Sequence, residues 1–237
     1  MGTRDTRRSA RRGAGGGRGP AAPRWLRRGG AAAVALLWLA TAAQAADLTG
    51  TVVDGAGAPL AGAVVFAQAL PAGTTLPPAP RTALMDQIDK QFVPRVLPVA
   101  IGTAVSFPNR DQIHHHVYSF SKAKTFEIPL YKGEATEPVV FDVLGAVQIG
   151  CNIHDWMSGV ILVVPTPYFA VSDADGAFTL VGLPDGKTPI AAWHEGLRTS
   201  LDATVQRIDV GAATPPPRFT IDAAARRGRS VGARGGE

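Results

Sequence analysis

The sequence predicts an all-β protein, and its composition and its apolar pattern are the observations behind that prediction. Of 237 residues, 27 are glycine and 19 are proline, which is a high share for a helical protein and an ordinary one for short strands joined by turns. Apolar residues nowhere keep a helical period between capping residues over about a dozen positions. With 46% hydrophobic residues the chain can bury a core, and its length allows one large or two small domains.

Residues 1–45 are interpreted as an export signal. A basic segment ends at Arg27-Arg28, and an apolar stretch from Ala31 to Ala43 follows it. The triplet Ala43-Gln44-Ala45 fits an A-x-A cleavage site, which places the start of the mature chain at Ala46. The apolar stretch is short for a membrane span, which needs about 20 residues. We therefore expect a cleaved signal peptide, a periplasmic location and no membrane span after cleavage. The alternative is an uncleaved anchor.

The basic charge of the chain is concentrated in this leader. Residues 1–45 hold nine arginines and one acidic residue, out of 24 basic and 19 acidic residues in the whole chain. The rest of the chain therefore holds 15 basic residues (24 less 9) and 18 acidic residues (19 less 1), a formal net charge of −3. This balance gives no reason to expect a nucleic-acid partner.

Runs with the alternation or the β-branched content of strands fill the chain after the leader, and turn motifs rich in glycine, proline and aspartate separate them. A middle segment differs in sequence pattern from the parts before and after it. The outer parts contain strand-like runs at 48–54, 60–67, 177–180, 190–194, 203–210 and 218–221. The middle segment has its own runs, at 85–92, 95–101, 104–107, 117–120, 139–143, 146–149 and 160–164. The alternative for a few of these short runs is a buried helix.

The two outer parts resemble one family. "GTVVDGAGAPLAGAVVFA" resembles the opening of the carboxypeptidase regulatory-like (transthyretin-like) β-sandwich family, and "VSDADGAFTLVGLPDG" resembles its continuation. We interpret 46–70 and 168–222 as one split β-sandwich with a second domain, 82–166, inserted at a loop, where insertions are tolerated. Residues 223–237 lack an apolar period and are expected to form a disordered tail. The alternative is a tandem of two independent folds with a truncated first one.

The middle segment carries the residues with metal chemistry. Cys151, His154 and Met157 offer a thiolate, an imidazole and a thioether at intervals of three residues. Such soft and borderline ligands suit copper, which changes between Cu(I) and Cu(II), and they suit Mg²⁺ or Ca²⁺ poorly. Cys151 is the single cysteine of the chain, so it cannot form a disulfide within it. A blue-copper site of two histidines, one cysteine and a weak axial methionine needs one more histidine, and the triplet 114–116 offers it.

The middle segment also resembles a known family. "FVPRVLPVAIGTAVSFPN", "HHVYSF" and "GCNIHDWMSGVILVV" are similar to segments of cupredoxins of the plastocyanin and amicyanin group, and the C-x-x-H-x-x-M spacing resembles the short ligand loop of amicyanins. "NRDQIHHHVYSFS" together with "CNIHDWM" resembles exported proteins that are labelled methylamine-utilisation proteins. The resemblance implies a cupredoxin Greek-key β-sandwich. It also implies one mononuclear type 1 copper bound by His115, Cys151, His154 and Met157.

The identity of the first histidine ligand depends on register. In the family, a small polar residue and then apolar residues of a strand follow the ligand, which favours His115, although His116 stands where the family often has asparagine. His114 and His116 remain alternatives. A slip of one residue would turn the imidazole to the other face of the strand. Zinc is the alternative metal, but structural zinc sites seldom use methionine. A binuclear copper centre would need a second cysteine.

Polar residues near the proposed ligands have two interpretations. Asn152 follows the cysteine, and Asn109 and Asp111 precede the histidine triplet. They are expected either to brace the ligand loops, as outer partners of metal ligands do, or to serve as ordinary turn residues that satisfy the backbone.

The expected function is the transfer of single electrons, and no enzymatic activity is expected. Four filled ligand positions leave no open position for a substrate. The resemblance implies that the edge of His154 reaches the surface within an apolar patch, to which Trp156 would add. It also implies transient redox partners, a dehydrogenase on one side and a c-type cytochrome on the other. The alternatives are a periplasmic copper chaperone or buffer, and an adhesion or docking module with an accessory copper domain.

Overall fold

The computed structural model describes residues 45–76, 82–133 and 137–223. These residues consist of strands and turns with a short 3₁₀ helix, η1 (Leu201–Thr204), and they contain no α-helix. The prediction of an all-β protein is confirmed. The predicted signal peptide, apart from its last residue, and the predicted tail after Ala223 lie outside the described residues. Within the described ranges, no helix is long and apolar enough to cross a membrane.

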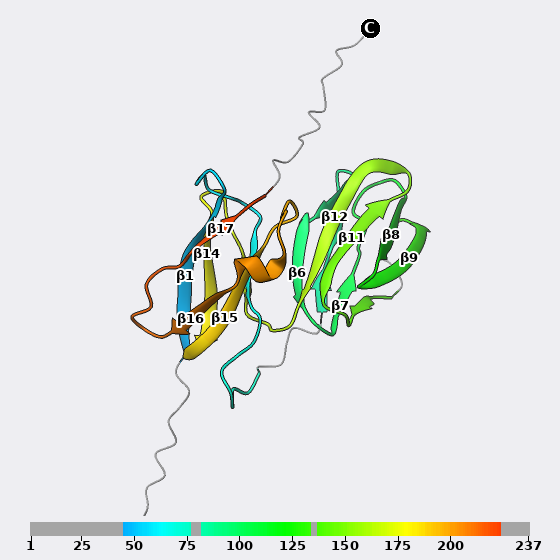
Figure 1. The fold of residues 1–237 in the computed structure, drawn as a ribbon. Helices are drawn as coiled ribbons and strands as arrows, with labels where there is room; N and C mark the ends of the chain where they lie inside the picture. Colours follow the sequence, from blue (N-terminus) through cyan, green and yellow to red (C-terminus); the bar gives the residue numbers. More distant parts are fainter. Residues whose placement is uncertain (1–44, 77–81, 134–136, 224–237) are drawn as a thin grey trace, which may run out of the picture. The chain divides into compact units, whose positions relative to one another are not determined.

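One set of strands comes from the two outer parts of the chain. In Figure 1 the blue β1 lies between β14 and β17, with β14 antiparallel and β17 parallel to it. A second sheet has the order β13-β2-β15-β16. Apolar side chains of both sheets form one buried cluster, which includes Leu48, Val65, Leu180, Ile190 and Phe219. The strands are β1 (Ala45–Asp54), β2 (Val64–Ala67), β13 (Phe169–Val171), β14 (Ala177–Pro184), β15 (Gly186–Trp193), β16 (Gln206–Val210) and β17 (Arg218–Ile221).

The other set of strands comes from the middle segment. Its main sheet has the order β6-β12-β11-β8-β9, a smaller sheet has the order β10-β7-β3, and β4 and β5 form a hairpin. A second buried cluster combines residues of all three, among them Phe92, Val105 and Ile161. The strands are β3 (Thr82–Leu84), β4 (Asp86–Ile88), β5 (Gln91–Val93), β6 (Val96–Ala100), β7 (Thr103–Ser106), β8 (His115–Ser121), β9 (Lys124–Tyr131), β10 (Val139–Phe141), β11 (Gly145–Cys151) and β12 (His154–Val164).

The alternation of β11 explains how the cysteine is directed inward. Val147, Ile149 and Cys151 are buried, whereas Gln148 between them is exposed. Because successive side chains of a strand point to opposite faces, the last of these three residues follows the apolar ones into the core. Cys151 and Met157 both belong to the second buried cluster, so the cysteine and the methionine share one core.

Several local differences separate the observed strands from the predicted ones, and the short strands β3 and β13 are among those not predicted. β9 was not predicted, because its charged residues and Pro129 weaken the strand pattern; it lies at the edge of its sheet, where both are tolerated. The run predicted to begin at Leu60 becomes a strand only at Val64, after a turn in which Gly62 has a positive φ of 75°. Ala203 lies in η1 rather than in a strand.

Candidate metal centre

Three donor side chains meet where the strands of the main sheet begin and end. His115 is the first residue of β8, Cys151 is the last residue of β11, and His154 is the first residue of β12. The ladder between β11 and β12 shifts register after Gly150, so that Cys151 pairs with His154 across a short turn. This turn and the neighbouring start of β8 bring the three side chains together.

The geometry of this cluster is compact. The Sγ atom of Cys151 lies 4.0 Å from Nδ1 of His115 and 3.6 Å from Nδ1 of His154. One donor atom from each residue lies within 4.8 Å of the other two. The two imidazole rings meet edge to face, with centroids 5.0 Å apart. A thiolate and two imidazole nitrogens at this spacing form a donor set for a soft or borderline metal ion.

Burial divides the donors into an enclosed group and one partly open side chain. His115 is fully buried, and Cys151 and Met157 are 3% and 2% exposed. His154 is half-buried, and the next two residues along β12 are exposed before Met157 turns inward. Met157 shares the apolar cluster of Cys151. The cluster therefore faces the protein interior on the side of His115 and solvent on the side of His154.

The histidine triplet separates into three different environments. His115 reaches Cys151, as described above, and the ladder of β8 with β9 shifts register between His115 and Val117. The His116 ring packs on Tyr118, with centroids 5.6 Å apart, and its Nε2 lies 2.8 Å from Oε1 of Glu127. His114 is exposed. Of the three, His115 is the one that the structure brings to the cysteine.

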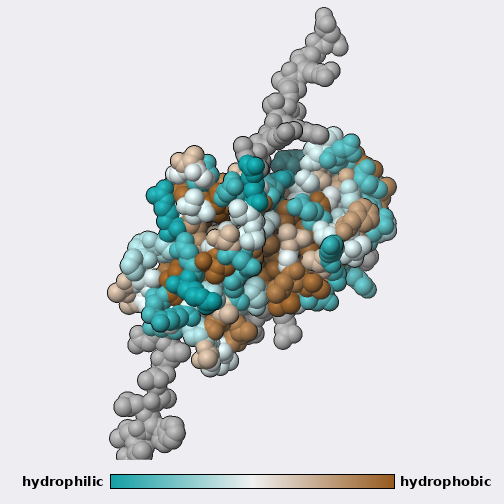
Figure 2. All heavy atoms as spheres, viewed as in Figure 1, coloured by the Kyte–Doolittle hydropathy of each residue, from teal (hydrophilic) through white to brown (hydrophobic). Residues whose placement is uncertain are grey.

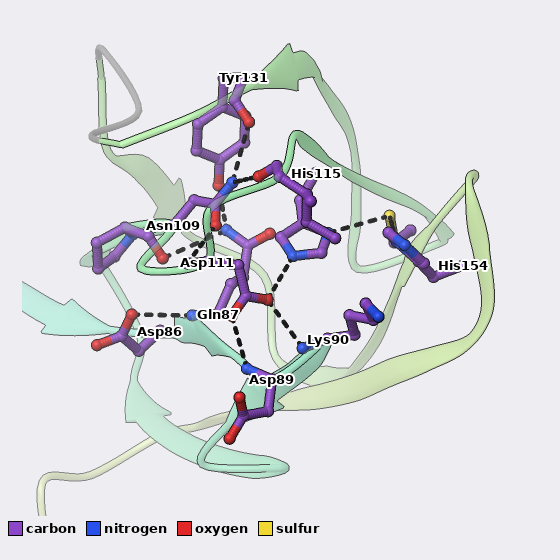
Figure 3. A network of polar contacts seen from close by, with 12 residues as sticks. Asp86, Gln87, Asp89, Lys90, Asn109, Asp111, His115, Tyr131 and His154 are labelled. Atoms are coloured by element: carbon purple, nitrogen blue, oxygen red, sulfur yellow. Dashed lines mark hydrogen bonds and ion pairs between the residues drawn. The ribbon is translucent and has the colours of Figure 1, made fainter.

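A carboxylate holds the far side of the His115 ring (Figure 3). Nε2 of His115 lies 2.7 Å from Oδ2 of Asp111. An ionised carboxylate only accepts hydrogen bonds, so Nε2 carries the proton and donates it. In the neutral ring the other nitrogen, Nδ1, is the unprotonated one, and it lies on the side that faces Cys151. This is the tautomer that a metal ion at the cluster requires.

The charge state of Asp111 agrees with this arrangement. Burial raises the pKa of the Asp111 carboxyl, but the hydrogen bonds from His115 and from the backbone of Lys90 and Asp89 outweigh that effect, so the pKa is lowered from its ordinary value. The carboxyl group is therefore ionised at neutral pH and acts as an acceptor towards all three groups.

The pKa of His154 is also lowered from its ordinary value. Burial is the largest cause, and the positive charges of His115 and Lys90 act in the same direction, while the negative charge of Asp111 opposes them. His154 is therefore neutral at neutral pH, which leaves one of its ring nitrogens free to bind a metal ion.

Two of the three polar residues singled out in the sequence contact the centre or its support. Asp111 bonds to His115, and Oδ1 of Asn109 accepts a hydrogen bond from the Asp111 backbone at 3.0 Å. Nδ2 of Asn109 donates to the carbonyl oxygens of Ile113 and Tyr131. Asn152 is exposed.

One further part of the support was not expected from the sequence. The turn residues Asp89 and Lys90, between β4 and β5, donate their backbone N–H groups to Asp111. The signal available was a two-residue gap between strand-like halves of 85–92, but the glycine that usually follows asparagine or aspartate in such a turn is absent here.

Apolar side chains are exposed next to His154. The Trp156 ring lies 5.5 Å from the His154 ring between centroids and is 62% exposed, and Ile153 is 48% exposed. Figure 2 shows hydrophobic and hydrophilic side chains interspersed over the visible face, which is ordinary for a protein surface. Exposure alone therefore does not distinguish Ile153 and Trp156 from other exposed apolar residues. The contact of the Trp156 ring with His154, a donor of the cluster, is what distinguishes them.

Comparisons with known proteins give a limited result. No protein-family model matches the chain, and no curated protein matches it. The oxidised state of an amicyanin mutant is 22% identical over 35% of this chain and 82% of its own, with a TM-score of 0.33. A purple cupredoxin from Nitrosopumilus maritimus is 22% identical over 35% of this chain and 97% of its own, with a TM-score of 0.30. At these values the likeness assigns neither a metal nor a partner to this chain.

Proposed function

We propose that this chain is an exported carrier of single electrons with one mononuclear type 1 copper ion, bound by His115, Cys151, His154 and Met157. The observation that carries the proposal is the convergence of one cysteine sulfur and two imidazole nitrogens within 4.8 Å, beside a buried methionine. When bound, copper supplies a one-electron change between Cu(I) and Cu(II).

The donor set favours copper over the alternative metals. Thiolate, imidazole and thioether are ligands that copper accepts in both oxidation states, whereas structural zinc sites seldom use methionine. Asp111, a carboxylate that contacts a donor of the cluster, lies behind the His115 ring and already accepts three hydrogen bonds. Hard cations, which prefer oxygen ligands, are therefore poorly served.

The positions of the residues suit electron transfer. His115 and Cys151 belong to strands and are buried, so they would keep nearly the same positions in both oxidation states. His154 is the donor closest to solvent, and its contact with the exposed Trp156 offers a place where a redox partner could approach. Docking there would be weak and transient, with a small interface. A dehydrogenase and a c-type cytochrome are the partners that we propose.

We propose the same split architecture that the sequence predicts. The pairing of β1 and β2 with strands after residue 168 supports a sandwich made of 46–70 and 168–222. The strands of 82–166 pair among themselves, which supports an inserted cupredoxin domain. The basic leader with its A-x-A triplet supports export to the periplasm.

Voltammetry of the copper-loaded protein tests the function. A carrier gives one reversible one-electron wave with a copper content of one ion per chain. A protein that holds Cu(I) but gives no reversible wave, and passes its copper to a chelator, would favour a copper buffer instead. Binding of more than one copper ion per chain with the same affinity would contradict the mononuclear site.

A further inference from the structure

The turn that connects β4 and β5 has an unusual backbone for its residues. Asp89 and Lys90 have φ values of 52° and 58°, both in the left-handed region. Two-residue hairpin turns of this kind favour asparagine or aspartate followed by glycine, so Asp89 is ordinary at its position and Lys90 is uncommon at its own. Such a conformation persists when surrounding contacts hold it. Both backbone amides of this turn donate to a single side chain.

That side chain is Asp111, which lies between the turn and the His115 ring (Figure 3). Its Oδ1 accepts a hydrogen bond from the Asp89 backbone at 2.7 Å, and its Oδ2 accepts one from the Lys90 backbone at 2.8 Å. Oδ2 also accepts the Nε2–H bond of His115 at 2.7 Å. One carboxylate thus joins the hairpin turn to a donor of the metal centre.

The backbone of Asp111 is held by a buried asparagine. Its backbone N–H donates to Oδ1 of Asn109, which is 4% exposed. The amide nitrogen of Asn109 is occupied by the carbonyl oxygens of Ile113 and Tyr131. The backbone of Asp111 is therefore anchored, which limits how far its carboxylate can follow the turn or the imidazole.

The same turn directs a positive charge to the metal centre. Figure 3 shows the Lys90 side chain extending from the turn towards His154. Its charge is close enough to act on the His154 ring. Asp111 thus presents its own negative charge to one histidine and, through the turn, the Lys90 ammonium to the other.

We propose that Asp111 is a positioning residue that couples the β4–β5 turn to His115 and lowers the reduction potential of the bound metal ion. The carboxylate fixes the tautomer in which Nδ1 is free, and it raises the electron donation of the ring, which stabilises the more highly charged oxidation state. This inference rests on the proposed function, because it concerns the same copper ligand.

The test compares Asp111→Asn with Asp86→Asn. Both substitutions remove one negative charge, but Asp86 lies on β4 and accepts hydrogen bonds from the Gln87 backbone and from Arg110. Asp111→Asn is expected to raise the reduction potential by at least the equivalent of a tenfold change in the redox equilibrium constant, about 59 mV for one electron. Asp86→Asn is expected to give less than a third of that rise. Equal shifts, or no shift in Asp111→Asn, would overturn the proposal.

A second measurement uses the metal-free protein. An asparagine has one side-chain acceptor in place of two, so at least one of the Asp89 and Lys90 amides must lose its partner. Hydrogen exchange at that amide is expected to accelerate at least tenfold in Asp111→Asn and to stay unchanged in Asp86→Asn, while the amide of Ile161 in the core reports that the fold is intact. Unchanged exchange at both turn amides would overturn the coupling.

The two measurements separate the failure of this inference from the failure of the proposed function. If the wild-type protein gave no reversible copper wave, the proposed function would fail, and exchange in the metal-free protein would still decide whether Asp111 holds the turn. If Asp111→Asn did not fold, Asp111→Glu would replace it. That variant keeps the charge but displaces the carboxylate, so faster exchange of the turn amides would support the coupling and unchanged exchange would contradict it.

Discussion

The Sγ atom of Cys151 lies 3.6 Å from Nδ1 of His154, and only two residues separate the cysteine from the histidine in the chain. The shift of register between β11 and β12 makes this possible, because it pairs the two residues directly across the turn. The turn therefore provides two donors by itself. Only the donor from β8, His115, has to be brought from a distant part of the sequence.

The first prediction concerns the histidine triplet. His115→Ala is expected to abolish the thiolate-to-copper absorption, because it removes the ring nitrogen that faces Cys151. His114→Ala is the matched control, since His114 is exposed, and it is expected to leave the spectrum unchanged. Loss of the absorption in His114→Ala and its retention in His115→Ala would show that the ligand assignment is wrong.

His116→Ala is expected to affect stability rather than colour. His116 is buried, packs on Tyr118 and bonds to Glu127. The loss of this packing and of one hydrogen bond is expected to lower the free energy of unfolding by about 1–3 kcal/mol. Urea denaturation measures that change, and the visible spectrum of the folded variant should match the wild type.

Met157 is predicted to tune the metal more than to hold it. Met157→Leu conserves the buried volume, so it should cost less than about 1.5 kcal/mol of stability and keep the colour. Removal of the thioether should raise the reduction potential, because less electron density would reach a bound Cu(II) ion. Met157→Ala, by contrast, leaves a cavity and should cost about 2–5 kcal/mol. An unchanged potential in Met157→Leu would argue against an axial role.

The lowered pKa of His154 gives a prediction for the metal-free protein. Because burial is its largest cause and the charge of Lys90 adds to it, Lys90→Gln should raise the pKa of His154 by a small amount without restoring its ordinary value. The unfolded chain binds this proton more readily than the folded chain. Stability therefore decreases as the pH falls below about 6.5, the ordinary histidine value. An NMR titration of the two proteins measures the pKa, and a raised wild-type value would contradict this sign.

Gly176→Ala should destabilise the protein without changing its metal centre. Gly176 has a φ of +72°, and a Cβ atom there would lie 2.3 Å from the carbonyl oxygen of Val52. The backbone must shift, so a loss of more than about 1 kcal/mol is expected in denaturation. Because Gly176 lies in the turn between β13 and β14, the spectrum of the folded, copper-loaded variant should not change.

The parts of this protein that follow from the sequence are those governed by local pattern. Alternation in β11 directs Cys151 to the core. The segment from Cys151 to Met157 consists of one short turn and the start of one strand. Both are readable from a few consecutive residues. The all-β fold is predictable for the same reason, because it follows from many short runs with turns between them.

The parts that could not be predicted depend on contacts between distant segments. The spacing of residues does not distinguish His115 from its neighbours with certainty, because a shift of register at the start of β8 affects which ring faces the core. The Asp89–Lys90 turn lacks the glycine that usually marks such turns, and it is held instead by Asp111, about twenty residues later. β9 has too many polar residues to be recognised without the sheet that it borders.

The visible absorption spectrum of copper-loaded protein, measured beside Cys151→Ser, tests the central claim most directly. A cysteine thiolate bound to Cu(II) gives an intense charge-transfer band at about 600 nm. The type 1 site proposed here predicts that band in the wild-type protein and its complete loss in Cys151→Ser, with the fold of the variant retained. A colourless wild-type protein, or a Cys151→Ser variant with the same colour, would contradict the site.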